Sequence, residues 1–265
     1  MRNKKVSVLM TVHNTSNYLK RAINSIISQT YKNIELIIVD DCSSDNSVKI
    51  IKNYKSKKIK KFFFKKNKGR IEALNFALKK STGDYVAILD SDDFSNKSRL
   101  KTQTRFLNED KSLMLVGSMT KIVNEKGKKM YIYPSKDEAS NFLDDIHHKN
   151  VFPFSTVLFK KKIIRNIGSF SRNINYAIDF EFILRVKKRY KIYLIPKILG
   201  LNTLRSESLT AKKNLAAGRT LDLIKILKFS NKNFNLNYKL QTIIFTKILI
   251  EYIKYIKYFF NFIGK

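Results

Sequence analysis

Residues 83–93 read GDYVAILDSDD, a short apolar run that stops abruptly at three carboxylates. About five apolar residues bounded by glycine and acids predict a central strand that is covered on both faces. Clustered carboxylates repel one another, so they persist mainly where a cation or a donor-rich ligand compensates their charge. The alternative is a solvated turn with a helix cap, because aspartate is common in both roles. The three carboxylates are Asp90, Asp92 and Asp93.

Similar apolar runs precede this stretch and alternate with helical patterns. Strands are predicted over 6–12, 34–39, 59–64 and 85–89, and helices begin near residues 17, 47 and 69. This alternation predicts a parallel, doubly wound sheet. Ligands bind at the carboxyl ends of the strands in such sheets. The polar residues expected to face one crevice are Thr11, Asn14, Asp40, Asp41, Asp90, Asp92 and Asp93.

Two common nucleotide-binding motifs are absent from the sequence. No G-x-G-x-x-G follows a predicted strand and no G-x-x-x-x-G-K-[ST] occurs, which argues against a dinucleotide fingerprint and a P-loop. A crevice lined by carboxylates cannot hold a phosphate directly. It needs a divalent cation between them, and hard oxygen ligands suit Mg²⁺ or Mn²⁺.

The composition is strongly basic, with 53 Lys and Arg against 21 Asp and Glu and a net charge of +32. Such a field attracts phosphates on nucleic acid, anionic lipid or a nucleotide substrate. Cys42 is the only cysteine, so no disulfide can form within the chain, and the first apolar run is too short for a signal peptide. We therefore expect a cytoplasmic protein.

Three segments in a fixed order resemble the inverting family 2 glycosyltransferases of the GT-A fold, of the type that builds bacterial surface polysaccharides. They are VSVLMTVHN (6–14), SQTYKNIELIIVDDCSSDNS (28–47) and NKGRIEALNFALKKSTGDYVAILDSDD (67–93), and the resemblance extends to about Arg205. It implies an α/β fold with a Rossmann-like, mostly parallel sheet, an acceptor-side subdomain and a C-terminal helical extension. The family usually has proline at Val12 and an aromatic residue at His13, a departure that affects base preference more than activity.

The resemblance also implies roles for the residues at the strand ends. Asp41 would accept a hydrogen bond from the N3–H of uracil, a donor that cytosine lacks at N3. Asp93 would ligate Mn²⁺ or Mg²⁺ directly, Asp92 would contact ribose and a metal-bound water, and Asp90 would support them. Asn75 lies near the base in related proteins, with helix packing as its alternative. The implied nucleotide-binding residues are Thr11, Val12, His13, Asn14, Asp41, Arg70, Asp92 and Arg205.

The expected general base lies in the segment IDFEFILR, residues 178–185. Asp179 opens a helix there and matches the family's aspartate, although Ile178 replaces the glutamate that usually precedes it. A simple helix cap is the alternative role, because the free amides and the helix dipole favour a carboxylate. Glu181, one helical turn further in, is the second candidate. The loop RSESLT (205–210) resembles the one that covers the diphosphate, without the family's usual histidine.

The second half offers two further features. His147 and His148 lie beside two aspartates, but adjacent histidines on a helix point apart, so a loop is favoured over a metal site. Residues 240–263 are apolar, but their polar positions fall on one helical stripe, which favours a helix lying in a membrane interface over a spanning one. Packing on the protein's own core is the alternative. The apolar positions are Ile243, Ile244, Ile248, Leu249, Ile253, Ile256, Phe259, Phe260 and Ile263.

The sequence therefore predicts an enzyme that moves a hexose or N-acetylhexosamine from a nucleotide-sugar donor, UDP-linked, to a hydroxyl of a glycan or lipid-linked acceptor. We expect it in surface polysaccharide or lipooligosaccharide synthesis, at the inner face of the membrane and without a nucleic-acid partner. The competing hypothesis is a catalytically impaired basic scaffold that binds anionic membrane or nucleic acid. The expected parts are a nucleotide-sugar half (1–110), an acceptor and base half (111–212) and C-terminal helices (213–265).

Overall fold

The computed structural model describes residues 4–206 and 215–263, with the side chains of the last helix described as far as residue 258. Its strands are β1 (Val6–Val12), β2 (Ile34–Asp40), β3 (Ile59–Phe63), β4 (Tyr85–Ile88), β5 (Phe94–Ser95), β6 (Leu113–Asn124), β7 (Lys129–Tyr133), β8 (Leu158–Lys160) and β9 (Lys191–Leu204). Its α-helices are α1 (Ser16–Ile27), α2 (Ser47–Asn53), α3 (Arg70–Lys80), α4 (Arg99–Glu109), α5 (Lys136–Ser140), α6 (Phe142–Asp145), α7 (Ile164–Ile167), α8 (Ile178–Arg189), α9 (Ala216–Asn233) and α10 (Tyr238–Ile263). Two 3₁₀ turns are η1 (Phe154–Thr156) and η2 (Lys161–Ile163).

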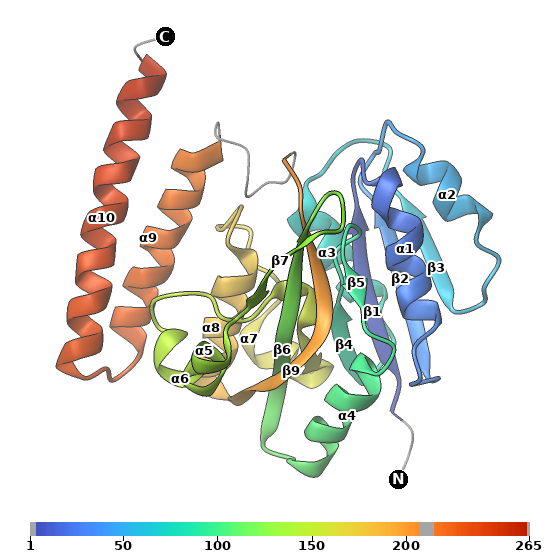
Figure 1. Ribbon diagram of the computed structural model, residues 1–265, viewed down its shortest axis with the longest axis horizontal. Coiled ribbons are helices and arrows are strands. Elements are labelled where there is room, and N and C mark those ends of the chain that lie inside the picture. Colours follow the sequence, from blue (N-terminus) through green and yellow to red (C-terminus); the bar gives the residue numbers. More distant parts are fainter. Residues whose placement is uncertain (1–3, 207–214, 264–265) are drawn as a thin grey trace.

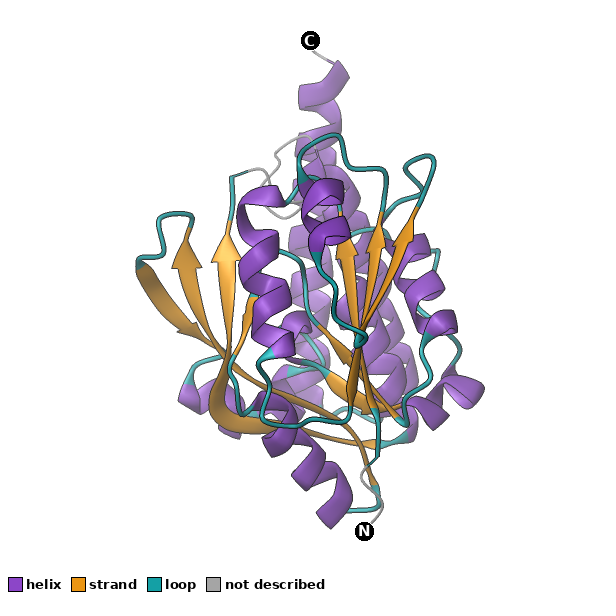
Figure 2. Ribbon diagram, turned by 90° about the vertical axis from the view of Figure 1, so that its right-hand side faces the viewer, coloured by secondary structure: helices purple, strands orange, loops and turns teal. Residues whose placement is uncertain are grey.

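The strands form one mixed sheet in the order β3-β2-β1-β4-β8-β6-β9-β5, with β7 paired to β6 (Figures 1 and 2). The first four strands in this order are parallel, as the sequence predicts. β1 and β2 are almost completely buried because helices cover both faces. Apolar residues of α1 pack on one face and those of α3 on the other. The carboxyl ends of β1, β2 and β4 therefore lie side by side.

The second half joins the same sheet through antiparallel pairing of β8 with β4 and with β6. The sequence predicts two short strands over 113–119 and 122–123, but the structure has one strand, β6, of 12 residues. The polar pair Thr120 and Lys121 resembles a break in the pattern. Both residues nevertheless pair with β9, which runs parallel to β6 and supplies backbone partners over its full length.

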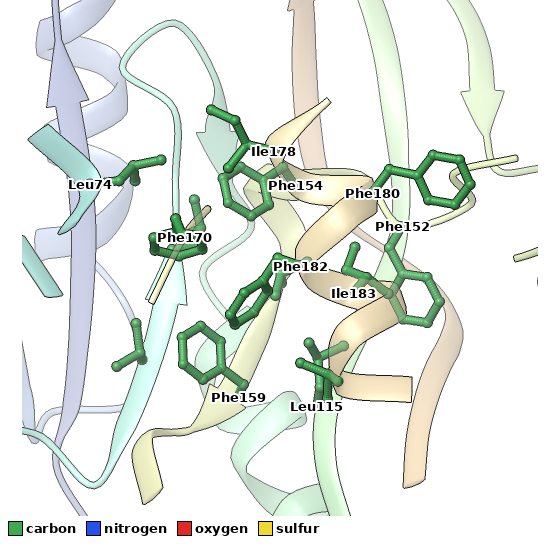
Figure 3. Close-up of a cluster of buried hydrophobic side chains, with 14 of the residues drawn as sticks. Leu74, Leu115, Phe152, Phe154, Phe159, Phe170, Ile178, Phe180, Phe182 and Ile183 are labelled. Carbon is green, nitrogen blue, oxygen red and sulfur yellow. The ribbon is translucent and has the colours of Figure 1, made fainter. Parts of the chain in front are cut away.

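An aromatic cluster joins the two halves of the molecule (Figure 3). Phe170 and Phe182 pack with their ring centroids 4.8 Å apart, and Phe159 and Phe182 with theirs 5.1 Å apart. α8 contributes Ile178, Phe180, Phe182 and Ile183 to this cluster, from its first turn onward. Burial of aromatic side chains contributes about 2–3 kcal/mol each relative to exposure. The cluster therefore fixes the position of α8 relative to the sheet.

The C-terminal helices α9 and α10 lie side by side, and α10 is the outermost helix, on the opposite side of the molecule from α1 and α2 (Figure 1). Leu227 of α9 packs with Leu240 and Ile244 of α10, and Ile243 and Ile248 pack against the same cluster. These positions of α10 therefore contact protein, contrary to the expectation that they enter a membrane. Leu249, Ile253 and Ile256 are exposed, whereas the side chains of Phe259, Phe260 and Ile263 lie outside the described residues. Among the helices that the structure describes, none has both the length and the apolarity needed to cross a bilayer.

Candidate active site

A large cavity of about 1060 Å³ opens at the carboxyl ends of the parallel strands. Its wall runs from Thr11 on β1 past Asp90 and Asp92 to Asp179 on α8, and continues to Lys254 on α10. Small-molecule sites usually have volumes of about 300–1,000 Å³, so this cavity has room for two substrates. The cavity therefore lies at the edge where ligands bind in doubly wound sheets.

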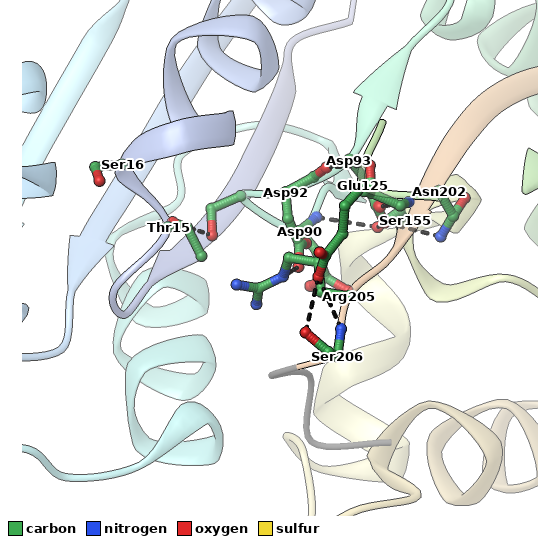
Figure 4. A network of polar contacts seen from close by, with 12 residues as sticks. Thr15, Ser16, Asp90, Asp92, Asp93, Glu125, Ser155, Asn202, Arg205 and Ser206 are labelled. Carbon is green, nitrogen blue, oxygen red and sulfur yellow. Dashed lines mark hydrogen bonds and ion pairs between the residues drawn. The ribbon is translucent and has the colours of Figure 1, made fainter. Parts of the chain in front are cut away.

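All three clustered carboxylates line this cavity, and two of them are paired with an arginine. Both Oδ atoms of Asp90 accept hydrogen bonds from Nη2 of Arg70, at 2.7 and 2.8 Å. Oδ2 of Asp92 accepts from Nε of Arg205 at 2.7 Å (Figure 4). Arg70 precedes Asp90 by 20 residues, whereas Arg205 follows Asp92 by 113 residues at the end of β9. The loop after β4 is thus held from both halves of the molecule.

Asp93, the metal ligand that the resemblance implies, is enclosed by hydrogen-bond donors of the protein. Its side chain is 4% exposed, Oδ2 accepts from Nδ2 of Asn202 at 2.8 Å and from the Ser155 hydroxyl, and Oδ1 accepts from the Thr203 amide at 2.9 Å (Figure 4). Burial raises the pKa of Asp93 well above its ordinary value, and the charges of Asp92 and Asp90 raise it further. Both oxygens accept from protein donors, so Asp93 joins the loop to β9 and η1. It also lines the cavity, and the direct metal ligation that the resemblance implies stays a prediction.

Asp90 and Asp92 form the donor set that fits a divalent cation. Burial raises the pKa of Asp92 and the nearby charge of Asp90 raises it further, so negative charge is crowded here. Among the described residues no group of three His, Cys, Asp or Glu side chains is arranged to hold a metal ion. Mg²⁺ and related ions often bind through one or two carboxylates together with substrate phosphates. Two carboxylates at the cavity wall match that pattern.

The nucleotide side of the cavity is built from the ends of β1 and β2. Thr11, Val12 and His13 line it, and Nδ1 of His13 lies 2.9 Å from the carbonyl oxygen of Asp41. The buried carboxylate of Asp41 accepts from the amides of Lys68 at 2.7 Å and Gly69 at 2.8 Å. Gly69 has φ +86°, a conformation that glycine adopts without strain. Asp41 thus fixes the loop that leads into α3, while its side chain lines the cavity.

Asn14 and Asn75 lie outside the cavity lining. Asn14 has φ +52°, and its Oδ1 accepts from the Ser44 amide at 2.8 Å, so it joins the loops after β1 and β2. The amide group of Asn75 bonds both the backbone N–H and the carbonyl of Phe170, at 3.0 and 2.9 Å. Asn75 therefore has the packing role. Contact between nucleotide and Asn14, as the resemblance implies, does not follow from this geometry.

Asp179 lies in the first turn of α8 and lines the cavity across from the acid cluster. Its Oδ2 accepts from Nδ2 of Asn150 at 2.7 Å. Burial raises the pKa of Asp179 above its ordinary value; Arg70 opposes this rise and Asp90 adds to it. Arg70 and Asp90 belong to the part of the cavity expected to hold the donor, so Asp179 lies close enough to that part to feel their charges. A raised pKa suits a proton acceptor that works near neutral pH.

Glu181 has a structural role instead. Its two carboxylate oxygens accept from Nε and Nη2 of Arg185 at 2.6 and 2.9 Å, and Arg185 also bonds the carbonyls of Ile167 and Ser169. Glu181 does not line the cavity. The geometry therefore gives no support to Glu181 as the second candidate for the base.

Several site residues carry no signal in the sequence. Asn150 orients Asp179, and Ser155 and Asn202 hold Asp93, yet none belongs to a recognisable pattern. His147 and His148, which suggest a metal site in the sequence, do not belong to a metal-binding group among the described residues. His147 packs its ring against Phe234, and burial, with the charge of Lys187 beside it, lowers its pKa to about 4.

Comparison with known proteins agrees with this architecture. Residues 7–168 match the family model described as glycosyl transferase family 2. An uncharacterized glycosyltransferase of Haemophilus influenzae is 35% identical over 188 residues, which cover 70% of this chain and 73% of that protein. A Rickettsia typhi glycosyltransferase is 29% identical, and the match covers 73% of this chain but only 62% of that protein.

Two solved structures share the fold at low sequence identity. Staphylococcus aureus TarS (residues 1–349), solved with UDP-GlcNAc, has a TM-score of 0.72 and 21% identity, covering 95% of this chain and 73% of that one. The Pyrobaculum calidifontis mannosyltransferase PcManGT, solved with GDP-Man and Mn²⁺, has a TM-score of 0.69 and 17% identity, covering 92% and 69%. These comparisons do not favour the hypothesis of a scaffold without catalysis. The chain therefore belongs to glycosyl transferase family 2 and is a glycosyltransferase with the GT-A fold.

Proposed function

We propose that this enzyme transfers a sugar from a UDP-linked donor to an acceptor hydroxyl with inversion at the anomeric carbon. The observation that carries the proposal is one cavity with Asp90 and Asp92 on one side and Asp179, with its raised pKa, on the other. The TarS structure contains UDP-GlcNAc and the PcManGT structure contains GDP-Man, so structural neighbours bind nucleotide sugars. Those complexes support a nucleotide-sugar donor, and Asp41 supports uridine because its carboxylate can accept the imide N–H.

The chemistry assigned to this chain's residues is a single displacement. Asn150 donates to Oδ2 of Asp179 and leaves Oδ1 as the proton acceptor. Asp179 removes the proton of the acceptor hydroxyl while that oxygen attacks the anomeric carbon from the face opposite the diphosphate. The bond to the diphosphate breaks, and the proton stays on Asp179. General base catalysis of this type contributes about 10²–10⁴-fold to the rate.

The donor diphosphate is assigned to the arginines beside the acid cluster. Arg70 and Arg205 line the cavity and are held by Asp90 and Asp92, so their guanidinium groups are already in place for phosphate oxygens. Asp90 and Asp92 would hold Mn²⁺ or Mg²⁺, which when bound supplies charge neutralisation for the leaving diphosphate. The Mn²⁺ in the PcManGT structure supports a divalent ion of this kind.

The proposed acceptor is a glycan or lipid-linked hydroxyl in surface polysaccharide or lipooligosaccharide synthesis, with a hexose or N-acetylhexosamine as the transferred sugar. The outer face of α10 supports a place at an anionic membrane surface. Phe245 is 70% exposed and Ile253 is 59% exposed, and Leu249 and Ile256 continue the same face. The net charge of +32 complements anionic lipid. An interfacial helix buries such a face in the acyl boundary.

The proposal is tested by screening UDP-sugars and GDP-sugars for slow hydrolysis, with Mn²⁺, with Mg²⁺ and with excess chelator. We expect one UDP-sugar to be hydrolysed faster than the others and only with a divalent ion. Equal hydrolysis of GDP-sugars would contradict the assigned base preference. The absence of hydrolysis or binding of every nucleotide sugar would contradict the proposed reaction.

A further inference from the structure

The cavity does not end at Asp179 but continues to a second wall that the donor chemistry leaves unused. This wall comes from residues 148–150 and from α10, which lie about 100 residues apart in the chain. Three of its lining residues are lysines, Lys149, Lys247 and Lys254, and one is an acid, Glu251. We call Lys149, Lys247 and Lys254 the lysine wall. Lys247 and Lys254 come from α10, the outermost helix, whereas Arg70 opens α3 and Arg205 follows β9 (Figure 1).

Lys247 is the central member of the lysine wall. Its Nζ donates to the carbonyl oxygen of His148 at 3.2 Å, and no ion pair joins it to an acid among the described residues. Burial lowers the pKa of Lys247, and the charges of Lys149 and Lys254 lower it further. The charges of Asp145 and Glu251 act in the opposite direction and raise the pKa. A cation that is partly buried beside other cations lowers stability unless an anion compensates it.

The other two lysines are held in place by acids. Lys149 forms ion pairs with Glu138 and Asp145, both at 3.0 Å, and neither of these acids lines the cavity. Lys254 pairs with Glu251 at 2.7 Å. The ammonium groups are therefore positioned before any ligand binds. Preorganised lysines are common binders of phosphate, where each acts as a point charge.

Resting on the proposed function, we propose that the lysine wall binds a phosphate group carried by the acceptor. The donor diphosphate is assigned to the arginines at the other end of the cavity, so a second anion site is available to the second substrate. An acceptor hydroxyl at Asp179 places the rest of the acceptor toward α10. The outer face of that helix is apolar and exposed. The phosphate belongs either to a lipid carrier or to a soluble phosphate-containing glycan.

The direct test measures the affinity of the full-length protein for inorganic pyrophosphate by calorimetry at fixed, low ionic strength. The double variant Lys247→Gln, Lys254→Gln should bind about tenfold or more weakly, because charge-assisted hydrogen bonds are lost. Lys257→Gln is the matched control, since Lys257 is an exposed lysine on the same helix outside the cavity lining. Lys247→Arg keeps the charge and should retain binding. The thermal unfolding of each variant is measured in parallel.

A variant of a donor arginine tests at which end of the cavity pyrophosphate binds. If Arg205→Gln removes all pyrophosphate binding while the double variant binds like wild type, the anion occupies the donor end alone and the lysine wall is not a phosphate site. Undetectable binding of pyrophosphate to the wild type would also overturn the inference. Hydrolysis of UDP-sugar by the wild-type protein needs no acceptor, so it tests the proposed function separately.

Vesicles separate the two sources of the phosphate. Phosphatidylcholine vesicles with and without a few per cent of a polyprenyl phosphate are compared in a sedimentation assay. A lipid carrier predicts that the polyprenyl phosphate increases binding and that the double variant loses this increase. A soluble glycan predicts no increase, with the effect of the double variant seen for pyrophosphate alone. Binding that is equal in wild type and double variant for both probes would contradict the inference.

Discussion

The sheet and the C-terminal helix pair bury their apolar residues in different ways. β1 and β2 are buried along almost their full length because their own chain covers both faces. α10 packs on α9 through Leu240 and Ile244 but exposes Phe245 and Ile253. The protein's own packing therefore accounts for the continuous apolar residues of the strands, but not for the exposed apolar side chains of α10. The difference is the basis for proposing the chemistry at the sheet region and a membrane contact at the exposed face of α10.

The largest expected effect concerns the chemistry at the edge of the sheet region. Asp179→Asn should lower turnover by about 10²–10⁴-fold while nucleotide-sugar binding is retained, because only the proton acceptor is lost. Steady-state kinetics and donor calorimetry measure the two quantities. Glu181→Gln is the control, since Glu181 pairs with Arg185 away from the cavity. Near-normal turnover in Asp179→Asn together with a large loss in Glu181→Gln would transfer the base to Glu181.

The next effect separates the two neighbouring acids of the β4 loop. Asp92→Asn should weaken Mn²⁺-dependent binding of UDP by about 10–100-fold or more, because Asp92 faces the cavity. Asp93→Asn should instead lower the free energy of unfolding by about 1–3 kcal/mol, because it disturbs the buried bonds to Ser155, Asn202 and Thr203. Calorimetry with and without chelator and denaturant unfolding provide the measurements.

Two outcomes would revise this assignment. Full UDP binding and full activity in excess chelator would contradict the use of a metal. If Asp93→Asn lost Mn²⁺-dependent binding at unchanged stability, the result would support the direct ligation by Asp93 that the family resemblance implies.

A smaller effect tests the other side of the comparison, the exposed face of α10. The double variant Phe245→Gln, Ile253→Gln should bind phosphatidylglycerol vesicles about 10- to 100-fold more weakly, because two apolar side chains no longer enter the acyl boundary. The matched control is Met130→Gln, Tyr131→Gln, which removes two exposed apolar side chains from β7. Equal vesicle binding by both double variants would show that α10 does not supply the membrane contact.

The smallest effect concerns the buried charge of Glu35, which lies at the amino ends of the parallel strands, opposite the cavity. Glu35 is 3% exposed and bonds Lys5, Lys60, Ser7 and Thr82. Burial opposes its ionisation, but these hydrogen bonds outweigh burial and hold the pKa of Glu35 below its ordinary value of 4.5. Glu35→Gln should lower the free energy of unfolding by about 1–2 kcal/mol at neutral pH.

The pH dependence of this effect has a defined sign. Because the folded-state pKa of Glu35 is depressed, its stabilisation is fully present above about 4.5 and is lost as pH falls through the folded-state pKa. The difference in unfolding free energy between wild type and Glu35→Gln should therefore shrink in acid. Glu109→Gln is the control, since the Arg105–Glu109 pair is exposed and contributes about 0–1 kcal/mol. A difference that is constant from pH 7 to pH 3 would contradict the role given to Glu35.

The sequence alone predicts the parallel half of the sheet and the position of its ligand site. Alternating apolar runs and helical patterns are local signals, and strand direction then places Thr11, Asp41, Asp90 and Asp92 at one edge. It also predicts a helix beginning at Asp179. The long strand β6 was less predictable, because its pairing with β9 joins segments about 80 residues apart. Local polarity at Thr120 and Lys121 carries no information about such a partner.

The tertiary structure alone distinguishes carboxylates that the sequence presents as equivalent. Asp92 and Asp93 are adjacent and both line the cavity, yet Asp92 pairs with Arg205 whereas Asp93 is enclosed by partners 62 to 110 residues away. Asp179 and Glu181 share one helix, yet Glu181 forms an ion pair with Arg185, whereas Asp179 accepts a hydrogen bond from Asn150. The lysines of α10 form a regular polar stripe in the sequence, but packing on α9 turns Lys247 and Lys254 into the cavity. Direction and burial of a side chain depend on what distant segments place beside it, and a local pattern does not contain those segments.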